Sequence, residues 1–350
     1  MAKREFHPEL VESILVLRLY FVGDVLLATP VLEALKRRFP GARLTVLIKK
    51  RAVAVLEGNP HVDEVVVYDA AENYHSPKWA RRLASGLRRR RFSLAVDLTG
   101  DLRSSWLLFA SDPGFRVGLN HVGMGFLLDR RIDYRATGHV VDHLLTAVEP
   151  LGAHSSDPAP RMYLTEEERA EAGALLAEVG VDTSSGALAL SPGANWPFRR
   201  WRPERFGELA ALARERLGLV SIVLGSGNDS GLAEAAVASS SGAAVSLAGR
   251  TNLRGLAAAA ERVRAFVGND SGPMHIAASV GTPVVGLFGP NTPERFGPRG
   301  APSRVLWKRP ACSPCSQKKC VRPDSTCMDE ITVREVLHAL ESLLNEGGSR

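Results

Sequence analysis

Two series of short apolar segments, each alternating with segments of helical periodicity, limit the folds open to this chain. In the first series we expect strands at residues 14–19, 44–48, 62–69, 93–98 and 115–119, with helices at 25–38 and 78–90. Apolar, β-branched strands separated by helices are typical of a parallel sheet that helices cover on its faces. The sequence therefore predicts an α/β fold.

A segment containing proline and serine, residues 149–164, separates the two series. A helix follows it, with Thr165 as the N-cap and Glu168 as the capping-box partner. The alternation then restarts, with strands expected at 187–191, 220–225, 244–249, 264–270 and 283–289 and helices at 203–217, 231–239, 253–262 and 273–280. We therefore expect two Rossmann-like domains, residues 1–155 and 156–350, facing each other across a ligand cleft at the carboxyl ends of their strands.

Hydropathy and charge narrow the function classes. No apolar run approaches the roughly 18–20 residues of a membrane-spanning helix, and the charged N-terminus does not resemble a secretory signal, so we expect a cytoplasmic protein. The net charge of +6 favours an anionic partner. We expect no nucleic-acid partner, because the chain lacks the common binding motifs and only 6% of its residues are aromatic. The basic run at 87–92 is either the solvated end of a helix or a contact with an anionic acceptor or lipid head group.

The most informative loop is "GNDSGPMH", residues 268–275, between an apolar strand and a helix. The free N–H groups of such a helix start form an anion site. Ser271 adds a hydroxyl, Gly272 lets the backbone approach closely, and His275 can donate to a phosphate oxygen. The alternative is that Asp270 or Ser271 only caps the helix and that His275 is a partly buried structural residue. We favour phosphate or nucleotide binding.

Two further loops follow predicted strands of the second series. One supplies Ser191, a turn at Gly193, and the pair Arg199 and Arg200, and the other begins a glycine-rich turn at Gly225. Guanidinium groups donate forked hydrogen bonds to phosphate oxygens, so the two arginines would neutralise a departing diphosphate. The alternative is that these arginines only make the surface soluble.

Taken in order, these motifs resemble those of the ADP-heptose:lipopolysaccharide heptosyltransferases, glycosyltransferase family 9. The resemblance extends from about residue 14 to residue 340 and rests on "FVGDVLLATP", "DLTGDLRS", "SPGANWPFRRW", "LGSGND" and "GNDSGPMHIAASVGTPVVGLFGP". It implies a GT-B fold, in which the N-terminal domain binds the acceptor and the C-terminal domain binds the nucleotide-sugar donor.

The resemblance also assigns roles to single residues. Asp24, which follows Gly23 on the acceptor side, matches the family's proposed catalytic base, and a carboxylate at a strand end can take a proton from an acceptor hydroxyl. The alternative is that Asp24 only caps a helix. The implied donor-binding residues are Ser191, Gly193, Arg199, Gly225, Asp270, Ser271, Gly272 and His275. Family members commonly carry lysine at the position of Arg199, which keeps the charge but changes the hydrogen-bond geometry.

The implied reaction is an inverting transfer of heptose from ADP-heptose to the lipopolysaccharide inner core, with no metal ion or other cofactor. The enzyme would act at the inner face of the cytoplasmic membrane, where its charge is compatible with peripheral contact with the anionic surface. Three alternatives stay open. They are a transferase of the same fold with another nucleotide sugar or glycan acceptor, a nucleotide-sugar epimerase, and a basic nucleotide-binding or nucleic-acid-binding protein.

All four cysteines lie in one segment, at Cys312, Cys315, Cys320 and Cys327. Thiolates can supply four ligands, so the spacing permits a zinc or iron–sulfur site, but it matches no standard zinc-finger pattern. We favour reduced structural cysteines over a metal site, and both over disulfides, which a cytoplasmic location disfavours. None of these states gives the cysteines a catalytic role.

Overall fold

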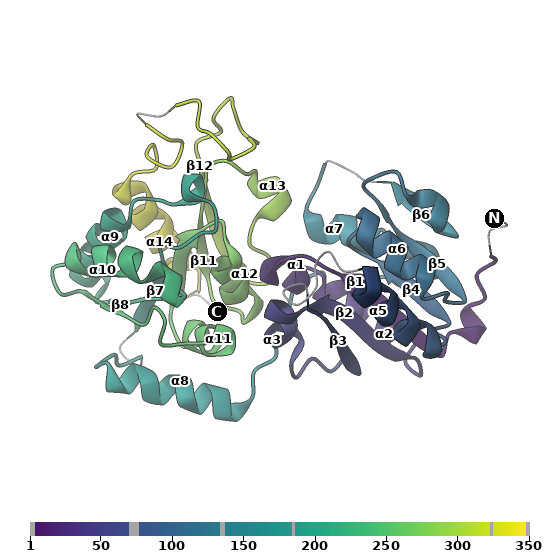
Figure 1. Ribbon diagram of the computed structural model, residues 1–350. Coiled ribbons are helices and arrows are strands. Elements are labelled where there is room, and N and C mark those ends of the chain that lie inside the picture. The colour runs from purple at the N-terminus through teal and green to yellow at the C-terminus, as the bar shows by residue number, and fades with distance from the viewer. Residues whose placement is uncertain (1–3, 70–76, 134–136, 184–185, 323–324, 348–350) are drawn as a thin grey trace. The chain divides into compact units, whose positions relative to one another are not determined.

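The computed structural model describes residues 4–69, 77–133, 137–183, 186–322 and 325–347. The chain divides into two compact units, Met1–Pro160 and Arg161–Arg350, each with its own six-stranded parallel sheet (Figure 1). The division lies after Pro160, whereas the sequence places it after residue 155. The two sheets confirm the prediction of two Rossmann-like α/β units.

The first sheet has the strand order β3-β2-β1-β4-β5-β6. Its strands are β1 (Ser13–Arg18), β2 (Arg43–Lys49), β3 (Glu64–Tyr68), β4 (Leu94–Asp97), β5 (Phe115–Asn120) and β6 (Arg130–Asp133). The sequence predicts the first five. It does not predict β6, because this edge strand is mostly charged and exposed and so carries no apolar run.

Helices pack on both faces of this sheet because the crossovers leave β1 in opposite directions and each is right-handed. The connections from β1 to β3 contain α1 (Val22–Leu26), α2 (Thr29–Arg38) and α3 (Val53–Leu56), those from β3 to β5 contain α5 (Pro77–Arg89) and α6 (Leu102–Ala110), and α7 (Val140–Leu145) follows β6. Short 3-10 helices are η1 (Pro8–Leu10), η2 (Lys50–Ala52), η3 (Gly125–Leu127) and η4 (Glu149–Leu151). On the α5 and α6 face, Leu15 and Leu17 of β1 form one core with Leu87 and Leu107.

The prediction of a single helix at 25–38 is wrong, because Pro30 interrupts it. Pro30 has no N–H to donate to the carbonyl of Leu26. The hydroxyl of Thr29 donates to that carbonyl instead, at 2.8 Å. The segment therefore forms two helices, and the first, α1, is a short one that carries Asp24.

The second sheet has the order β12-β11-β10-β7-β8-β9, which read from its other edge is the order of the first sheet. Its strands are β7 (Ala187–Ser191), β8 (Val220–Val223), β9 (Ala244–Ser246), β10 (Ala265–Asn269), β11 (Val284–Phe288) and β12 (Ser303–Trp307), of which β12 is not predicted. Its helices are α8 (Glu166–Glu178), α9 (Pro203–Leu217), α10 (Ser230–Ala238), α11 (Leu253–Glu261), α12 (Gly272–Ser279), α13 (Pro293–Phe296) and α14 (Val333–Gly347), with η5 (Pro197–Arg199) and η6 (Gly227–Asp229). Leu188 and Leu190 of β7 share a core with Phe206 of α9 and Leu340 of α14.

In each sheet the chain first adds strands on one side of the central strand and then crosses over to add strands on its other side. The place where the direction changes is called the reversal point. It lies between β1 and β4 in the first sheet and between β7 and β10 in the second. Ligands of open α/β sheets bind outside the carboxyl ends of the strands at such a point. The topology therefore selects the loops after these four strands as the places to look for a site.

Candidate active site

Asp24 lies in the first turn of α1, directly after β1. Its Oδ2 accepts a hydrogen bond from the Phe21 N–H at 3.2 Å, so the carboxylate closes the start of the helix. Its Oδ1 lies 3.5 Å from Nη2 of Arg18, and 29% of the Asp24 side chain is exposed. The capping contact that the sequence offered as an alternative is present, and the carboxylate is nevertheless accessible.

Arg18, which the sequence analysis does not identify, orients Asp24. This arginine is buried at the end of β1, donates from Nε to the backbone carbonyl of Asp24 at 3.2 Å, and donates from Nη1 to the carbonyl of Leu98, after β4. Burial lowers the pKa of Arg18, and the charge of Asp24 opposes this shift. The position of Asp24 is therefore fixed at the reversal point of the first sheet. The only sequence signal for Arg18 is a charge at the end of an otherwise apolar strand.

A buried carboxylate, Asp97, supports the same corner from the end of β4. It accepts hydrogen bonds from the N–H groups of Thr99 and Gly100 at 2.9 and 3.0 Å and from the hydroxyl of Ser104 at 2.8 Å. The hydroxyl oxygen of Thr99 in turn accepts from the Leu19 N–H at 2.8 Å. Burial raises the pKa of Asp97 to about 6, although these hydrogen bonds oppose it. Asp97 thus ties the loop after β4 to the segment after β1.

In the second unit, the loop after β10 leads into α12 with Ser271 as the N-cap residue and Gly272 as the first helical residue. The hydroxyl of Ser271 does not cap the helix but donates to the carbonyl of Asn269 at 3.2 Å. The first backbone N–H groups of α12 are thus left uncapped by that side chain, as in sites that bind anions. His275 lies at the end of the same first turn and is only 7% exposed.

Arg199 and Asp270 meet beside the start of α12. Nη1 of Arg199 lies 3.2 Å from Oδ2 of Asp270, and Nδ2 of Asn291, after β11, donates to the same oxygen at 2.6 Å. Burial raises the pKa of Asp270, whereas Arg199 and Asn291 act in the opposite direction. Because a carboxylate repels phosphate, Asp270 would support the predicted anion site by holding Arg199 and not by binding the anion itself.

Asn269 joins two loops at this edge of the sheet. Its Nδ2 donates to the Pro192 carbonyl at 2.9 Å, and its Oδ1 accepts from the Trp201 N–H at 3.0 Å. The side chain is fully buried, so water cannot replace either hydrogen bond. The loop at 192–201, which carries Arg199, is therefore attached to the end of β10.

Two of the predicted glycines leave room for Asp229, which lies in the loop after β8. A Cβ atom on Gly193 would lie 2.5 Å from Oδ1 of Asp229, and a Cβ atom on Gly225 would lie 3.0 Å from the Cβ of Asp229. Asp229 is held in place by Ser226, whose N–H and hydroxyl donate to Oδ2 at 2.9 and 2.7 Å. The structure thus gives both glycines a packing role, and their contact with a donor stays a prediction.

The predicted donor residues lie at the carboxyl ends of the neighbouring strands β8, β7 and β10. We call this side of the second sheet the donor edge. Ser191 is at this edge but fully buried at the end of β7. Gly23 and Asp24 belong to the first unit. Asn269, the last residue of β10, and Asn291, after β11, are further polar residues at strand ends, and the same strand-end argument could have selected them.

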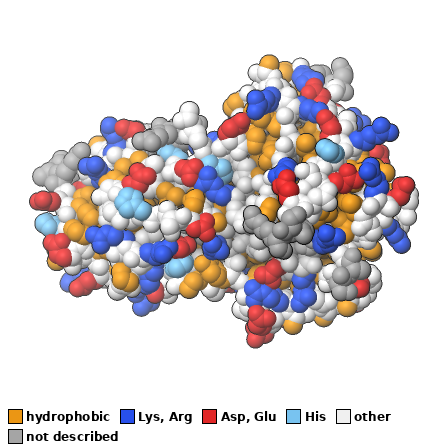
Figure 2. Space-filling model, turned by 180° about the vertical axis from the view of Figure 1, so that it is seen from behind, with side chains coloured by type: hydrophobic (Ala, Val, Ile, Leu, Met, Phe, Trp, Pro, Cys, Tyr) orange, Lys and Arg blue, Asp and Glu red, His pale blue; other side chains and the backbone are white. Residues whose placement is uncertain are grey.

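The basic run at 87–92 has acidic partners. Nη2 of Arg88 lies 3.2 Å from Asp112, and Nη2 of Arg90 lies 2.6 Å from Glu64. These pairs favour the solvated end of a helix over an anion contact. On the face shown in Figure 2, Lys and Arg side chains are likewise interspersed with Asp and Glu. No helix in the described part of the chain is long and apolar enough to cross a bilayer.

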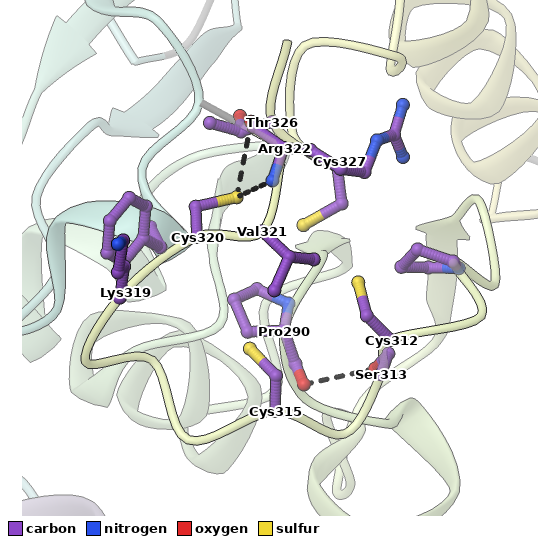
Figure 3. A pocket seen from close by; sticks show the side chains of 12 residues that line it. Pro290, Cys312, Ser313, Cys315, Lys319, Cys320, Val321, Arg322, Thr326 and Cys327 are labelled. Atoms are coloured by element: carbon purple, nitrogen blue, oxygen red, sulfur yellow. Dashed lines mark hydrogen bonds between the residues drawn. The ribbon is translucent and has the colours of Figure 1, made fainter. Parts of the chain in front are cut away.

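The four cysteines are not paired in disulfides in the structure and line one pocket of about 50 Å³ in the segment between β12 and α14 (Figure 3). Cys327 is buried, and burial, together with the other three thiols, raises its pKa to about 11. Within the described ranges, no three Cys, His, Asp or Glu side chains are grouped so as to hold a metal ion. The reduced state of these cysteines stays a prediction.

Known proteins share both the sequence pattern and the fold. The profile of glycosyltransferase family 9 (heptosyltransferase) matches residues 80–325. Lipopolysaccharide heptosyltransferase 2 of Salmonella typhimurium is 26% identical over 348 residues, which cover 96% of this chain and 99% of that protein. The lipopolysaccharide core heptosyltransferase OpsX of Haemophilus influenzae is 25% identical over 292 residues, 82% of each chain.

A solved structure extends this similarity to the whole chain. The crystal structure of the family 9 glycosyltransferase from Veillonella parvula has a TM-score of 0.88 and 27% identity and covers 99% of this chain and 100% of the other. The family profile alone matches more than half of the sequence. The chain therefore belongs to glycosyltransferase family 9 (heptosyltransferase) and is a glycosyltransferase.

Proposed function

We propose that this glycosyltransferase moves a heptose from ADP-heptose to the inner core of lipopolysaccharide in one inverting displacement. Membership of family 9 supports glycosyl transfer, and the two relatives described above are lipopolysaccharide heptosyltransferases. The observation that carries the proposal is that each unit presents one of the required charges at its reversal point. These are the accessible carboxylate of Asp24 and the guanidinium of Arg199.

Asp24 is the base in this proposal. As the acceptor hydroxyl oxygen bonds to the anomeric carbon of the heptose, its proton passes to the Asp24 carboxylate. The contacts with Arg18 and with the Phe21 N–H restrict the orientation of that carboxylate before the acceptor arrives. Such preorganisation saves the cost of orienting the base during the reaction.

The start of α12 and Arg199 stabilise the leaving group. The bond between the anomeric carbon and the diphosphate oxygen breaks as the new bond forms, and its electron pair stays on ADP. The negative charge that develops on ADP would be stabilised by the backbone N–H groups of Ser271 and Gly272 and by the cation of Arg199. His275 is the further donor in this set. Because these groups supply the positive charge, the proposal needs no metal ion or other cofactor.

The acceptor places the reaction at a membrane surface. The lipopolysaccharide core is linked to a lipid, so we propose that the protein works at the inner face of the cytoplasmic membrane. The net charge of +6 is compatible with peripheral contact with anionic lipids. Nucleic acid is not a partner in this proposal.

The substitution Asp24→Asn separates chemistry from donor binding. It keeps the shape of the side chain but removes the base, so we expect kcat for heptose transfer to fall by about 10²–10⁴-fold. ADP affinity, measured by calorimetry, should stay at the wild-type value because the donor residues belong to the second unit. The control Asp133→Asn changes a 67% exposed carboxylate of the same unit and should leave kcat unchanged. Full activity in Asp24→Asn would overturn the assignment of the base.

A further inference from the structure

The segment that holds the cysteines reaches the donor edge of the second sheet through Gln317. Its Oε1 accepts from Nε of Arg199 at 2.6 Å, and its Nε2 donates to Oδ1 of Asn291 at 3.1 Å. Asn291 donates to Asp270, which pairs with Arg199. These four side chains close a ring of polar contacts, which we call the donor-edge ring.

The donor-edge ring accepts an amide at position 317 in one orientation only. Arg199 can only donate and ionised Asp270 can only accept, so Asn291 must turn its NH₂ toward Asp270 and its oxygen toward Gln317. Gln317 must therefore present its oxygen to Arg199 and its NH₂ to Asn291. A glutamate would place a second acceptor against the Asn291 oxygen, and an alanine would leave both neighbours without this partner.

The ring fixes the plane of the Arg199 guanidinium. Nε is bound to Gln317 and Nη1 to Asp270, and the arginine side chain is only 21% exposed. Among the described residues none bonds to Nη2 of Arg199, so this nitrogen is the one left to meet an anion. A planar guanidinium held at two of its nitrogens has a defined direction for its remaining donors.

The cysteine segment is anchored beside the same turn. The hydroxyl of Ser313 and the N–H of Cys315 both donate to the carbonyl of Pro290, which precedes Asn291, at 3.0 and 3.2 Å (Figure 3 shows the first). Gln317 itself has a φ of 60°, in the left-handed region that residues other than glycine seldom adopt. Such backbone conformations persist where surrounding contacts hold them and are frequent at functional sites.

We infer that Gln317 is a positioning residue for the nucleotide diphosphate, which it serves by fixing Arg199 within the donor-edge ring. The inference rests on the proposed function, in which Arg199 binds the donor diphosphate. It gives the cysteine segment a role in donor binding that needs no reaction at a thiol. It also identifies a residue whose substitution should affect the donor and leave the acceptor unaffected.

Three substitutions in the full-length protein test this inference, with calorimetric titration of ADP and steady-state kinetics as readouts. We expect Gln317→Ala to weaken ADP binding and raise KM for ADP-heptose by at least about tenfold, as expected for losing a hydrogen bond to a charged group. KM for the acceptor should not change. Gln317→Glu should weaken ADP further, because its carboxylate competes for Arg199 and repels the diphosphate. Ser316→Ala changes an exposed neighbour in the same loop and should match the wild type.

A double-mutant cycle distinguishes positioning from a general structural effect. Lysine lacks the Nε–H that Gln317 accepts, so Gln317→Ala should change ADP affinity by less than about twofold in an Arg199→Lys background. A full tenfold effect in that background would overturn the inference, as would a Gln317→Ala variant with wild-type ADP affinity. If Arg199→Ala, which removes the charge, leaves ADP affinity unchanged, the donor site of the proposed function is wrong, and the inference falls with it. Thermal unfolding of each variant checks that it is folded.

Discussion

The charged residues at the two reversal points are each held by neighbours that restrict their orientation. Asp24 is held by Arg18 within the first unit, and Arg199 is held by Asp270 and Gln317 within the second. Arg199 and Asp270 are predicted from the sequence because they stand in polar motifs after apolar strands, and Asp24 is predicted because it matches a motif of the family that the chain resembles. It does not find Gln317, because this residue contacts Arg199 from 118 positions away and lies in a segment without periodicity.

A pH dependence of stability follows from Asp97. Its folded-state pKa is about 6 against an ordinary value of 3.8, so the folded protein binds this proton more tightly than the unfolded chain does. The contribution of Asp97 to the free energy of unfolding is therefore complete below about pH 4 and lost as the pH rises through 6, which amounts to about 3 kcal/mol.

The Asp97→Asn variant isolates this contribution from other titrating groups. Urea denaturation at intervals from pH 4 to pH 7 should show that the free energy of unfolding of the wild type, relative to the variant, decreases with pH. The exposed-site variant Asp133→Asn should show no such trend relative to the wild type. A constant difference between Asp97→Asn and the wild type would mean that Asp97 ionises as an exposed carboxylate does.

Among the secondary-structure elements, the four central strands and one edge strand of each sheet are predictable, and the other edge strand is not. The central strands are buried on both faces and consist of apolar runs, and the edge strands β3 and β9 carry apolar runs as well. The edge strands β6 and β12 are only partly buried, and their mixed composition removes that signal. The division between α1 and α2 depends on the Thr29 hydroxyl and on Pro30, which act on single hydrogen bonds and not on the periodicity.

Asn269 attaches the loop after β7 to the end of β10, so we predict that Asn269→Ala strongly lowers the stability of the fold. The substitution leaves the Pro192 carbonyl and the Trp201 N–H without their partner in a fully buried place. We expect the free energy of unfolding to fall by about 2–4 kcal/mol. Asn195→Ala, an exposed amide of the same loop, should change it by less than about 0.5 kcal/mol. Equal stabilities of the two variants in urea denaturation would contradict the role assigned to Asn269.

For the whole molecule, two units of the same strand order each place polar residues at the reversal point of a parallel sheet. This arrangement was predictable, because the alternation of strands and helices determines the fold class and the strand ends select the loops. The acceptor is not predictable in the same way. Loop residues recognise it, and their contacts depend on tertiary structure that no periodic pattern encodes.

The proposed reaction uses no metal, so we predict that the intact protein keeps its transfer activity when metals are removed. Dialysis against a chelator should leave the heptose transfer rate unchanged, and titration of the denatured protein should detect four reduced thiols, as the sequence contains. Addition of Mg²⁺ or Zn²⁺ to the dialysed protein serves as the control. A metal that copurifies in stoichiometric amount, with loss of transfer on its removal, would contradict the metal-free reaction.

The most direct test of the proposed function follows ADP release together with the mass of the acceptor. The full-length protein is supplied with ADP-heptose, with or without lipopolysaccharide that lacks its heptoses, and with UDP-sugars in parallel. We predict that ADP release requires the acceptor, that the acceptor gains the mass of one heptose, and that UDP-sugars give no product. ADP release without acceptor, or transfer from a UDP-sugar in place of ADP-heptose, would contradict the proposed function.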